Sequence, residues 1–290
     1  MVLASLCFAV MGVFVKQSVR DVPFLVAVFF RAFVGFVTLF VYFRLKGAPL
    51  GATQHWLLLL RSVVGFLALT FFFFALEYLP LSTAVILNFS SPVFVVILSG
   101  FILHEKRTGR ILPFVGAAFL GATLLVSPDL SSINIAAVLG LASAFFAAVA
   151  YISVRRLSRT ESSATIVLYF SMYASILGLI SLMVASAMGI KGFGLNEMAR
   201  ALADPVTIAL LCGVGLVATL GQIFLTSAFA LERASVVSGF SYLNPLLSYI
   251  LGLVLFDEVP TAAGLIGGMV VIVSCLGVLM VSHEPVKHPA

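Results

Sequence analysis

Two apolar stretches of the chain carry a proline near their middle: LNFSSPVFVVIL at Leu87–Leu98 and FSYLNPLLSYIL at Phe240–Leu251. Each lies within an apolar run long enough to cross the hydrocarbon core of a bilayer, about 30 Å thick, as a helix. Proline removes one backbone hydrogen bond from a helix and crowds the carbonyl four residues earlier. Two such prolines at matching positions therefore predict a pair of kinked or broken membrane helices.

The composition of the whole chain indicates a membrane protein. Hydrophobic residues make up 62% of it and charged residues 9%, whereas soluble domains are roughly 45–50% apolar and about 25% charged. The apolar runs are continuous, so they lack the alternation that is typical of a transmembrane β-barrel. We therefore predict an all-α polytopic membrane protein whose short loops leave no room for a soluble domain.

Breaks rich in charged residues, glycine and proline divide the chain into ten candidate transmembrane helices. The predicted spans are 2–19, 22–43, 55–76, 81–103, 110–127, 133–153, 164–187, 205–229, 235–256 and 261–282. With a cytosolic N-terminus, the outer loops hold only Lys16, Arg20, Lys191 and Arg200, and the inner side holds most other Lys and Arg residues. The positive-inside rule then predicts that both termini are cytosolic, in a bacterial inner membrane.

The remaining composition excludes several other classes of site. Cys7, Cys212 and Cys275 lie in apolar runs without CxxC spacing, so we interpret them as packing residues. No metal site and no cofactor is expected. The net charge of +5 is best explained by loop residues that set topology, and we expect no nucleic-acid partner.

An internal repeat relates the two proline-containing stretches. The segment ALEYLPLSTAVILNFSSPVFVVILSGFILHEKRT (75–108) resembles ALERASVVSGFSYLNPLLSYILGLVLFDEVPT (230–261). In this match Pro92 corresponds to Pro245 and Glu105 to Glu258, with a two-residue gap. The two glutamates precede predicted helices, where an anion near the helix start is favourable.

The repeat divides the chain into two five-helix units, 1–129 and 130–290. Because five is an odd number, the second unit must enter the membrane from the opposite side. The predicted fold is therefore ten transmembrane helices arranged as two inverted five-helix repeats around a central cavity, an architecture that many secondary transporters use for alternating access.

The prolines also predict where this cavity lies. Loss of the proline N–H frees the carbonyls of Asn88 and Ser241 at mid-depth, and free carbonyls are costly in lipid. We therefore expect both helices to face a protein-lined or wet cavity, with Pro92 and Pro245 as hinges. A static kink, satisfied by neighbouring Ser or Thr side chains, is the alternative.

Candidate substrate-binding residues are polar or amphipathic side chains within or close to the predicted spans. They are Asn88, Ser91, Tyr242, Asn244, Gln222, Arg31, Tyr78, Tyr173 and Tyr249. Arg31 suits a substrate carboxylate, but equally a helix contact or snorkelling. Gln222 is also explained by a helix–helix hydrogen bond, and some tyrosines by an interfacial belt. Lys16 and Arg61, nearer span ends, are expected to snorkel.

Other absences narrow the mechanism. No Asp or Glu lies in the middle of a predicted span, so a buried carboxylate proton relay has no evident carrier. Facilitated transport and coupling through the substrate's own protons both stay open. The chain has no GxSxG, no HExxH and no paired intramembrane aspartates, and it is not expected to be an enzyme.

A ten-span chain with a duplicated half, whose fourth helix reads aliphatics, SP, aliphatics and Glu, resembles the EamA family of the drug/metabolite transporter superfamily. Here the signature is LNFSSPVFVVILSGFILHEKRT, with a second copy FSYLNPLLSYILGLVLFDEVPT, in which Asn244 replaces the commoner Ser. The resemblance covers essentially the whole chain and is strongest to bacterial amino-acid exporters. It implies a central cavity lined by both halves, with outward-open and inward-open states.

These observations favour a secondary transporter that exports amino acids or related small metabolites by alternating access. The alternative is an importer of a larger cofactor-like or nucleoside-like solute, such as S-adenosylmethionine or riboflavin, on the same fold. The expected partners are a small-molecule substrate and membrane lipid, and the chain is expected to be a monomer or a weak homodimer.

Overall fold

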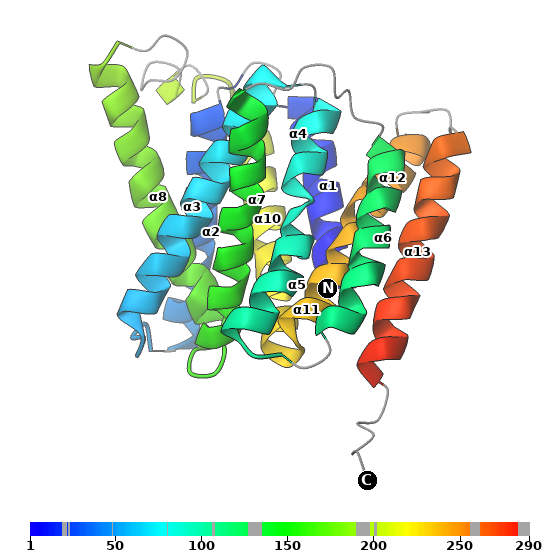
Figure 1. The fold of residues 1–290 in the computed structure, drawn as a ribbon. Helices are drawn as coiled ribbons and strands as arrows, with labels where there is room; N and C mark the ends of the chain where they lie inside the picture. Colours follow the sequence, from blue (N-terminus) through cyan, green and yellow to red (C-terminus); the bar gives the residue numbers. More distant parts are fainter. Residues whose placement is uncertain are drawn as a thin grey trace.

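The structure is a computed structural model. It describes residues 1–18, 22, 24–47, 49–79, 81–105, 108–126, 135–189, 198–199, 202–255 and 262–283. The unbroken helices are α1 (Val2–Ser18), α2 (Phe24–Lys46), α3 (His55–Tyr78), α6 (Thr108–Val126), α7 (Ile135–Leu157), α8 (Ser163–Ala187), α10 (Pro205–Leu231) and α13 (Ala262–His283). Two further spans are broken, so the described residues form ten helical units (Figure 1).

Helices form here because a backbone in lipid must satisfy its polar groups internally. Among the described residues, seven helical stretches are long and apolar enough to cross a membrane: Leu25–Lys46, His55–Ala75, Ala84–Ile102, Ile135–Leu157, Ser163–Ala187, Pro205–Leu231 and Ala262–Val281. Shorter apolar helices cover Val2–Phe14 and Gly109–Leu124. The predicted all-α membrane fold is confirmed, and the largest error is at the end of α7, predicted at residue 153 and found at Leu157.

The fourth span is broken into α4 (Leu81–Asn88) and α5 (Ser91–Ile102). The break precedes the proline, because Pro92 lies in the first turn of α5, where no intrahelical N–H is needed. Ser90 fills the gap: its backbone N and its Oγ donate to the Leu87 carbonyl at 3.2 and 2.6 Å, and its own carbonyl accepts from Val93 N at 3.1 Å.

The ninth span is broken at the corresponding place. It consists of α11 (Ala234–Gly239), the single 3₁₀ turn η1 (Phe240–Tyr242) and α12 (Leu243–Leu255). Pro245 lies in the first turn of α12, so both prolines begin the second part of their span. Sequence reasoning placed a kink around each proline, and the structure moves each irregular turn to the residues just before it.

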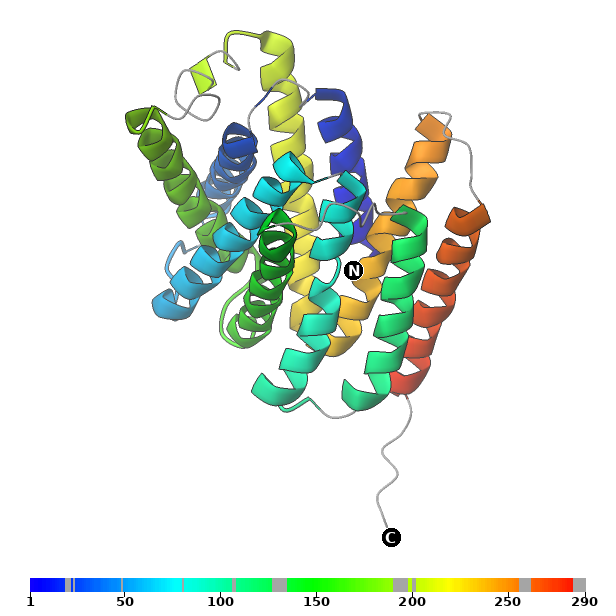
Figure 2. The ribbon, with the colours of Figure 1, turned by 45° about the horizontal axis from the view of Figure 1, so that its top comes forward.

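The helices pack in corresponding pairs. We call α1–α6 the N-terminal half and α7–α13 the C-terminal half. Helix α2 packs on α8 and α6 on α13, while α3 contacts α7, α1 contacts α10, α5 contacts α7 and α1 contacts α12. Exchanging the two halves maps this set of pairs onto itself. Helix α1 rises in Figure 1 whereas α7 descends to the loop before α8, and Figure 2 shows the same arrangement tilted forward.

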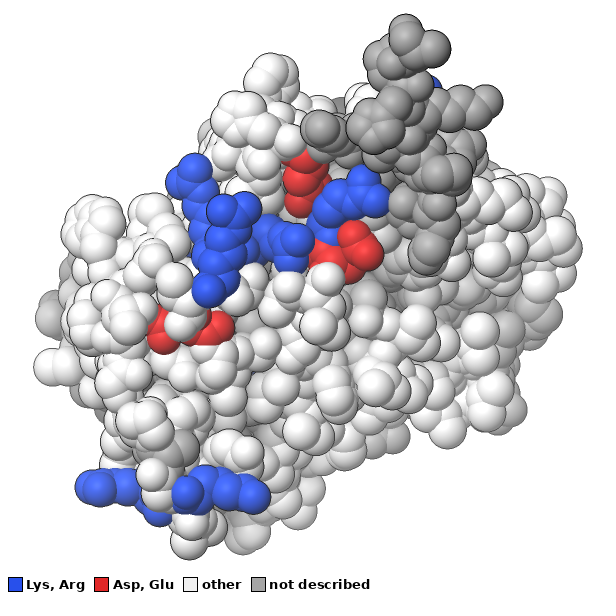
Figure 3. Space-filling model, turned by 90° about the horizontal axis from the view of Figure 1, so that it is seen from below, with Lys and Arg blue, Asp and Glu red and all other residues white. Residues whose placement is uncertain are grey.

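Basic side chains gather on the lower face, which Figure 3 shows from below. They lie at helix ends on that face and are Arg44, Lys46, Arg110, Arg155, Arg156, Arg159 and Arg233. Of the residues predicted on the opposite side, Arg20, Lys191 and Arg200 lie outside the described residues, as does Glu258. The cytosolic assignment of the lower face stays a prediction.

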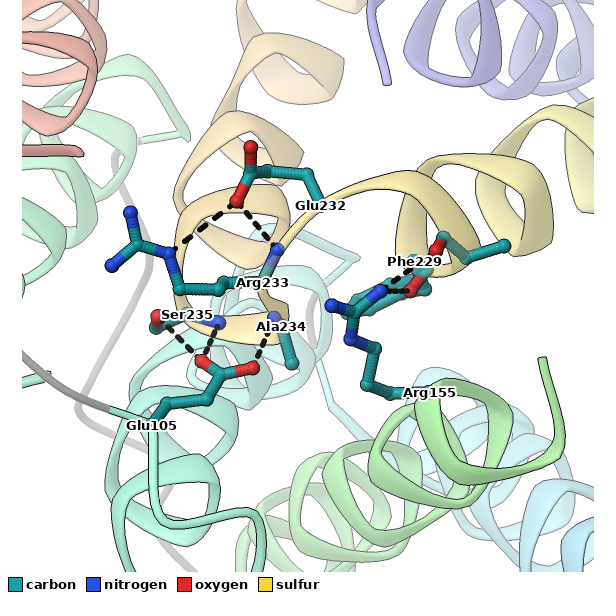
Figure 4. A network of polar contacts seen from close by, with 8 residues as sticks. Glu105, Arg155, Phe229, Glu232, Arg233, Ala234 and Ser235 are labelled. Atoms are coloured by element: carbon teal, nitrogen blue, oxygen red, sulfur yellow. Dashed lines mark hydrogen bonds and ion pairs between the residues drawn. The ribbon is translucent and has the colours of Figure 1, made fainter. Parts of the chain in front are cut away.

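Glu105 joins the two halves at this face (Figure 4). Its carboxylate accepts hydrogen bonds from Ala234 N at 2.7 Å, Ser235 N at 3.1 Å and Ser235 Oγ at 2.7 Å. The two backbone N–H groups are donors that the first turn of α11 leaves without intrahelical partners. Sequence reasoning associated Glu105 with the helix that follows it, and the structure shows that it caps a helix of the other half.

Glu161 makes a second connection between the halves, from the loop that joins α7 to α8. Its Oε1 accepts from Thr53 Oγ1 at 2.7 Å, from Gln54 N at 3.0 Å and from Thr53 N, just before α3 begins. Partial burial raises the pKa of Glu161, but these hydrogen bonds outweigh it and hold the pKa below its usual value.

Candidate functional site

A cavity of about 360 Å³ lies between the two halves, beside both broken spans. Its lining comes from α1, α2, α3, α4, α5, α7, α8, α10, η1 and α12, and no described residue of α6 or α13 belongs to it. Those two helices pack on each other instead. The volume is within the roughly 300–1,000 Å³ usual for small-molecule sites.

The breaks contribute four polar residues to this lining. Asn88 and Ser91 come from the first break, and Ser241 and Asn244 from the second. In the repeat alignment Asn88 corresponds to Ser241 and Ser91 to Asn244, so each pair of related positions supplies one amide and one hydroxyl, in opposite order. The structure thus brings together three of the predicted residues, with Ser241, which sequence reasoning had noted only for its carbonyl.

The two amides have different settings. Asn88 Nδ2 donates to Ser143 Oγ at 3.1 Å, and Ser143 in turn donates to the Gly140 carbonyl at 2.6 Å. Asn244 Oδ1 instead accepts from Ser248 Oγ at 3.2 Å. Within the part of the chain that the structure describes, this leaves the amide oxygen of Asn88 and the amide nitrogen of Asn244 for a ligand.

Arg31 and Gln222 also reach the cavity. Arg31 lies on α2 and Gln222 on α10, where it is 8% exposed. Nε of Arg31 is buried and has no hydrogen-bond partner among the described residues. Both were candidates for helix–helix contacts as well as for substrate binding, and the lining places both where a solute can touch them.

Arg61 is a functional candidate that sequence reasoning misjudged. It was expected to snorkel, but it is 3% exposed, lines the cavity, and has a buried Nε without a partner among the described residues. Its guanidinium carbon lies 4.2 Å from the centroid of the Phe170 ring, a cation–π contact. Gly65, one turn along α3, leaves room for it, because an added Cβ there would collide with Arg61 Nη1.

Tyr151 completes this part of the site from α7. It lines the cavity together with both arginines, and its ring stacks on that of Phe229 with centroids 5.2 Å apart. Sequence reasoning named it only among several tyrosines that suit an amphipathic cavity. That α2 and α3 bring Arg31 and Arg61 to one cavity could not be inferred without the packing of these helices.

Four predicted tyrosines are not brought to the cavity lining. Tyr78 is 55% exposed and packs on Phe74 with ring centroids 4.6 Å apart. Tyr173 lies beside Tyr169 on α8, and Tyr249 packs against the buried cluster between α6 and α13. The structure does not bring these three tyrosines to the described lining, and a role for them in binding a solute stays a prediction.

Tyr242 is the fourth, and it has a structural contact instead. It is fully buried, and its hydroxyl donates to the Phe89 carbonyl at 2.9 Å. That carbonyl belongs to the turn between α4 and α5, and Val93 N donates to Ser90 rather than to Phe89. Tyr242 therefore links the second break to the first. Pro92 and Pro245 are buried behind the lining, and their hinge role stays a prediction.

The apolar wall of the cavity is aromatic. It includes Phe8, Phe72, Phe73, Phe89 and Phe170, and the described lining contains no Asp or Glu. Such a site combines two cations, neutral amide and hydroxyl groups and large apolar faces. It is suited to bind a small solute, and the described lining does not bring together a nucleophile and a base in the manner of a catalytic site.

Comparison with known proteins identifies the family. The model of the EamA-like transporter family matches residues 1–127 and again residues 134–280. The chain belongs to the EamA-like transporter family. It is a multi-pass membrane transporter and not an enzyme, as predicted.

Among named relatives, this EamA-like protein is similar to the "Pseudopaline exporter CntI" of Pseudomonas aeruginosa, strain PAO1. The two are 34% identical over 279 residues, 95% of this chain and 93% of the relative. It is also 25% identical over 253 residues to the "S-adenosylmethionine uptake transporter" of Rickettsia felis, covering 87% and 81% of the two chains. These relatives support metabolite transport in general, and they do not specifically support the predicted likeness to amino-acid exporters.

A solved crystal structure shares the fold of this EamA-like chain. It superposes with a TM-score of 0.77 and covers 96% of this chain and 94% of that one, at 16% sequence identity. At this identity the likeness concerns the fold alone. It supports the arrangement of helices around the cavity and says nothing of the solute.

Proposed function

We propose that this protein is a secondary transporter that exports a small metabolite by alternating access. The observation that carries the proposal is the cavity itself, which the two broken spans and both halves line in a protein of a transporter family. Irregular backbone at membrane depth is tolerated where it borders a cavity, and discontinuous helices at a repeat interface are a common place for a solute site.

The proposed mechanism uses the two units 1–129 and 130–290 as inverted repeats. Three features support it: the packing pairs that exchange of the halves preserves, the opposite directions of α1 and α7, and the separate family matches to each half. Rocking of one half against the other would expose the cavity to each side in turn, with the breaks before Pro92 and Pro245 as hinges.

Export is the proposed direction because a relative at 34% identity is named as an exporter. The expected amino-acid substrates form one class to be tested within small metabolites. Import of a cofactor-like solute is the second candidate, and the similarity to an uptake transporter favours it. We place the chain in a bacterial inner membrane with its basic lower face in the cytosol, as a monomer or weak homodimer.

Counterflow in proteoliposomes tests the transport proposal. Vesicles loaded with an unlabelled candidate should accumulate the labelled form of the same solute, across panels of amino acids, organic acids and cofactors. Asn88→Ala and Asn244→Ala should impair this exchange at normal expression, with exposed Tyr78→Phe as the matched control. Absence of exchange with every class would reject the function, and full exchange in both asparagine variants would move the site elsewhere.

A further inference from the structure

We propose that the transported solute is a small organic anion with two negative charges, and that Arg31 and Arg61 recognise it. This inference rests on the proposed transport function and names the substrate class of the same cavity. The two arginines come from neighbouring helices, α2 and α3, and both side chains line the cavity.

The first step is the charge balance of the cavity. Among the described lining residues there are two arginines and no Asp or Glu. Nε of Arg31 and Nε of Arg61 are buried, and neither has a hydrogen-bond partner in the part of the chain that the structure describes. A buried cation is costly unless an anion or acceptor accompanies it. An arriving anion therefore gains attraction that water would otherwise screen.

The second step is that Arg61 is held in place. Its side chain is 3% exposed, so its charge does not reach the basic lower face as a snorkelling side chain would. The contact with the Phe170 ring, 4.2 Å from the guanidinium carbon, orients the plane of the group. This contact attracts the cation but supplies no oxygen acceptor to its N–H groups. Its donors are preorganised for a ligand.

The presence of two arginines also indicates how many negative charges the solute carries. Arg61 lies over the Phe170 ring, and Arg31 borders a small hollow beside the same ring, so both arginines lie close to one aromatic side chain of the cavity. Their like charges repel each other there. A monoanion balances only one of them. A zwitterion brings no net charge and places an ammonium group beside two cations. A dianion neutralises the pair, which is why we assign this charge state to the solute.

The remaining lining describes the body of the solute. Phe72, Phe73 and Phe89 offer apolar faces, while Asn88 and Asn244 offer neutral hydrogen bonds. A cavity of about 360 Å³ holds a small molecule with an apolar or aromatic group. Carboxylates and phosphates both match the fork of a guanidinium group. The site thus selects an oxygen-rich dianion, and experiment decides between two carboxylates and one phosphate.

Ligand binding to the purified full-length protein in detergent tests this inference without requiring transport. Five probes share a phenyl group and differ in charge: benzylsuccinate with two carboxylates, phenyl phosphate, 3-phenylpropionate with one carboxylate, zwitterionic phenylalanine and cationic phenethylamine. Calorimetry and thermal shift should show that at least one dianion binds roughly tenfold or more tightly than 3-phenylpropionate. Phenylalanine and phenethylamine should bind more weakly still.

Substitution of each arginine tests its role. Arg31→Gln and Arg61→Gln should each weaken dianion binding roughly tenfold or more and reduce the preference for dianion over monoanion. Arg31→Lys and Arg61→Lys should recover part of the affinity, because they restore the charge without the planar fork. Arg44→Gln, at the exposed end of α2, removes a cation far from the lining and should bind as the wild type does. The unfolding temperature measured without ligand identifies any glutamine variant that misfolds. In that case the lysine variant at the same position is used for the binding measurement.

Three results would overturn the inference: no binding by either dianion, binding of phenylalanine or phenethylamine as tight as that of the dianions, or wild-type affinity in both glutamine variants. These outcomes are separable from failure of the transport function. Dianion binding without counterflow would contradict the transport function and support dianion recognition. Counterflow of a zwitterion without dianion binding would support the transport function and contradict dianion recognition.

Discussion

At the scale of single residues, the contact among Gly65, Arg61 and Phe170 decides how a charge is held inside the membrane. The missing side chain at Gly65 leaves space that Arg61 Nη1 and the Phe170 ring occupy. Glycine in a helix normally costs about 0.5–1 kcal/mol relative to alanine. Glycine at position 65 forgoes the stability that alanine would give, and in return the guanidinium group of Arg61 has space at the cavity wall.

Gly65→Ala should therefore lower the affinity for a transported solute without the stabilisation that alanine usually brings. The new Cβ would lie 2.9 Å from Phe170 Cε2 and would displace Arg61 from the ring. The matched control is Gly116→Ala in α6, where no atom lies within 4 Å of the added Cβ. Unfolding temperature and counterflow measure both effects. Equal behaviour of the two variants would contradict the packing described.

Tyr242→Phe isolates a single hydroxyl between the two breaks. It removes the donor to the Phe89 carbonyl and leaves that acceptor unsatisfied, at a cost of about 1–3 kcal/mol. We expect a lower unfolding temperature and slower exchange. Tyr78→Phe, at a side chain that is 55% exposed, should change neither. An unchanged Tyr242→Phe protein would show that the hydroxyl has no role in joining the breaks.

Single residues also show where prediction from sequence ends. Asn88, Asn244 and Arg31 could be found because a polar side chain inside an apolar run needs a partner or a cavity. Arg61 could not be identified as a cavity residue, because its position near the end of a predicted span does not show how far the cavity extends toward that end. Tyr242 and Tyr78 are equally amphipathic in the sequence, and only packing decides which of them is buried.

At the scale of elements, the broken spans follow from the chemistry of proline. The breaks themselves were predictable, since each proline removes a hydrogen bond in mid-span. Their position was not, because proline is accepted in the first turn of a helix and the irregular turn shifts to the residues before it. The connection of Glu161 to the start of α3 was also beyond reach, since 107 residues separate it from Gln54.

The capping of α3 by Glu161 predicts a dependence of stability on pH. Because hydrogen bonds hold the pKa of Glu161 below its ordinary value of 4.5, the contact stabilises the fold above that value. Its contribution should fall as the pH decreases through the lower folded pKa. Glu161→Gln should therefore unfold at a lower temperature than wild type at pH 7, and the difference should shrink in acid. A constant difference at all pH values would assign the effect to packing.

At the scale of the whole molecule, corresponding contacts relate the two halves around one cavity. The outer pairs α2–α8 and α6–α13 lie at opposite ends of the fold, and the broken spans lie between them (Figure 1). On the lower face the carboxylate of Glu105 joins α5 to the start of α11 in the other half. Separation of the halves at this face has to break that contact.

Glu105→Gln should make the cavity more accessible from the lower face. Glutamine removes the negative charge that favours the start of α11 and one of two acceptor oxygens. In a protein without native cysteines, a cysteine introduced at Ser241 reports access through its rate of thiol labelling. We expect faster labelling than in Glu232→Gln, an exposed glutamate that pairs with the neighbouring Arg233. Equal rates would show that Glu105 does not restrain this face.

The opposite hydrogen-bond roles of Asn88 and Asn244 make the two ends of the cavity chemically different. One break offers an amide oxygen where the other offers an amide nitrogen, because Ser143 and Ser248 hold them in opposite senses. A rotation that superposes the halves places an amide of one on a hydroxyl of the other. The binding site is therefore asymmetric, although the arrangement of helices around it is symmetric. A chiral solute should thus bind in one orientation only, and its enantiomer should be transported poorly.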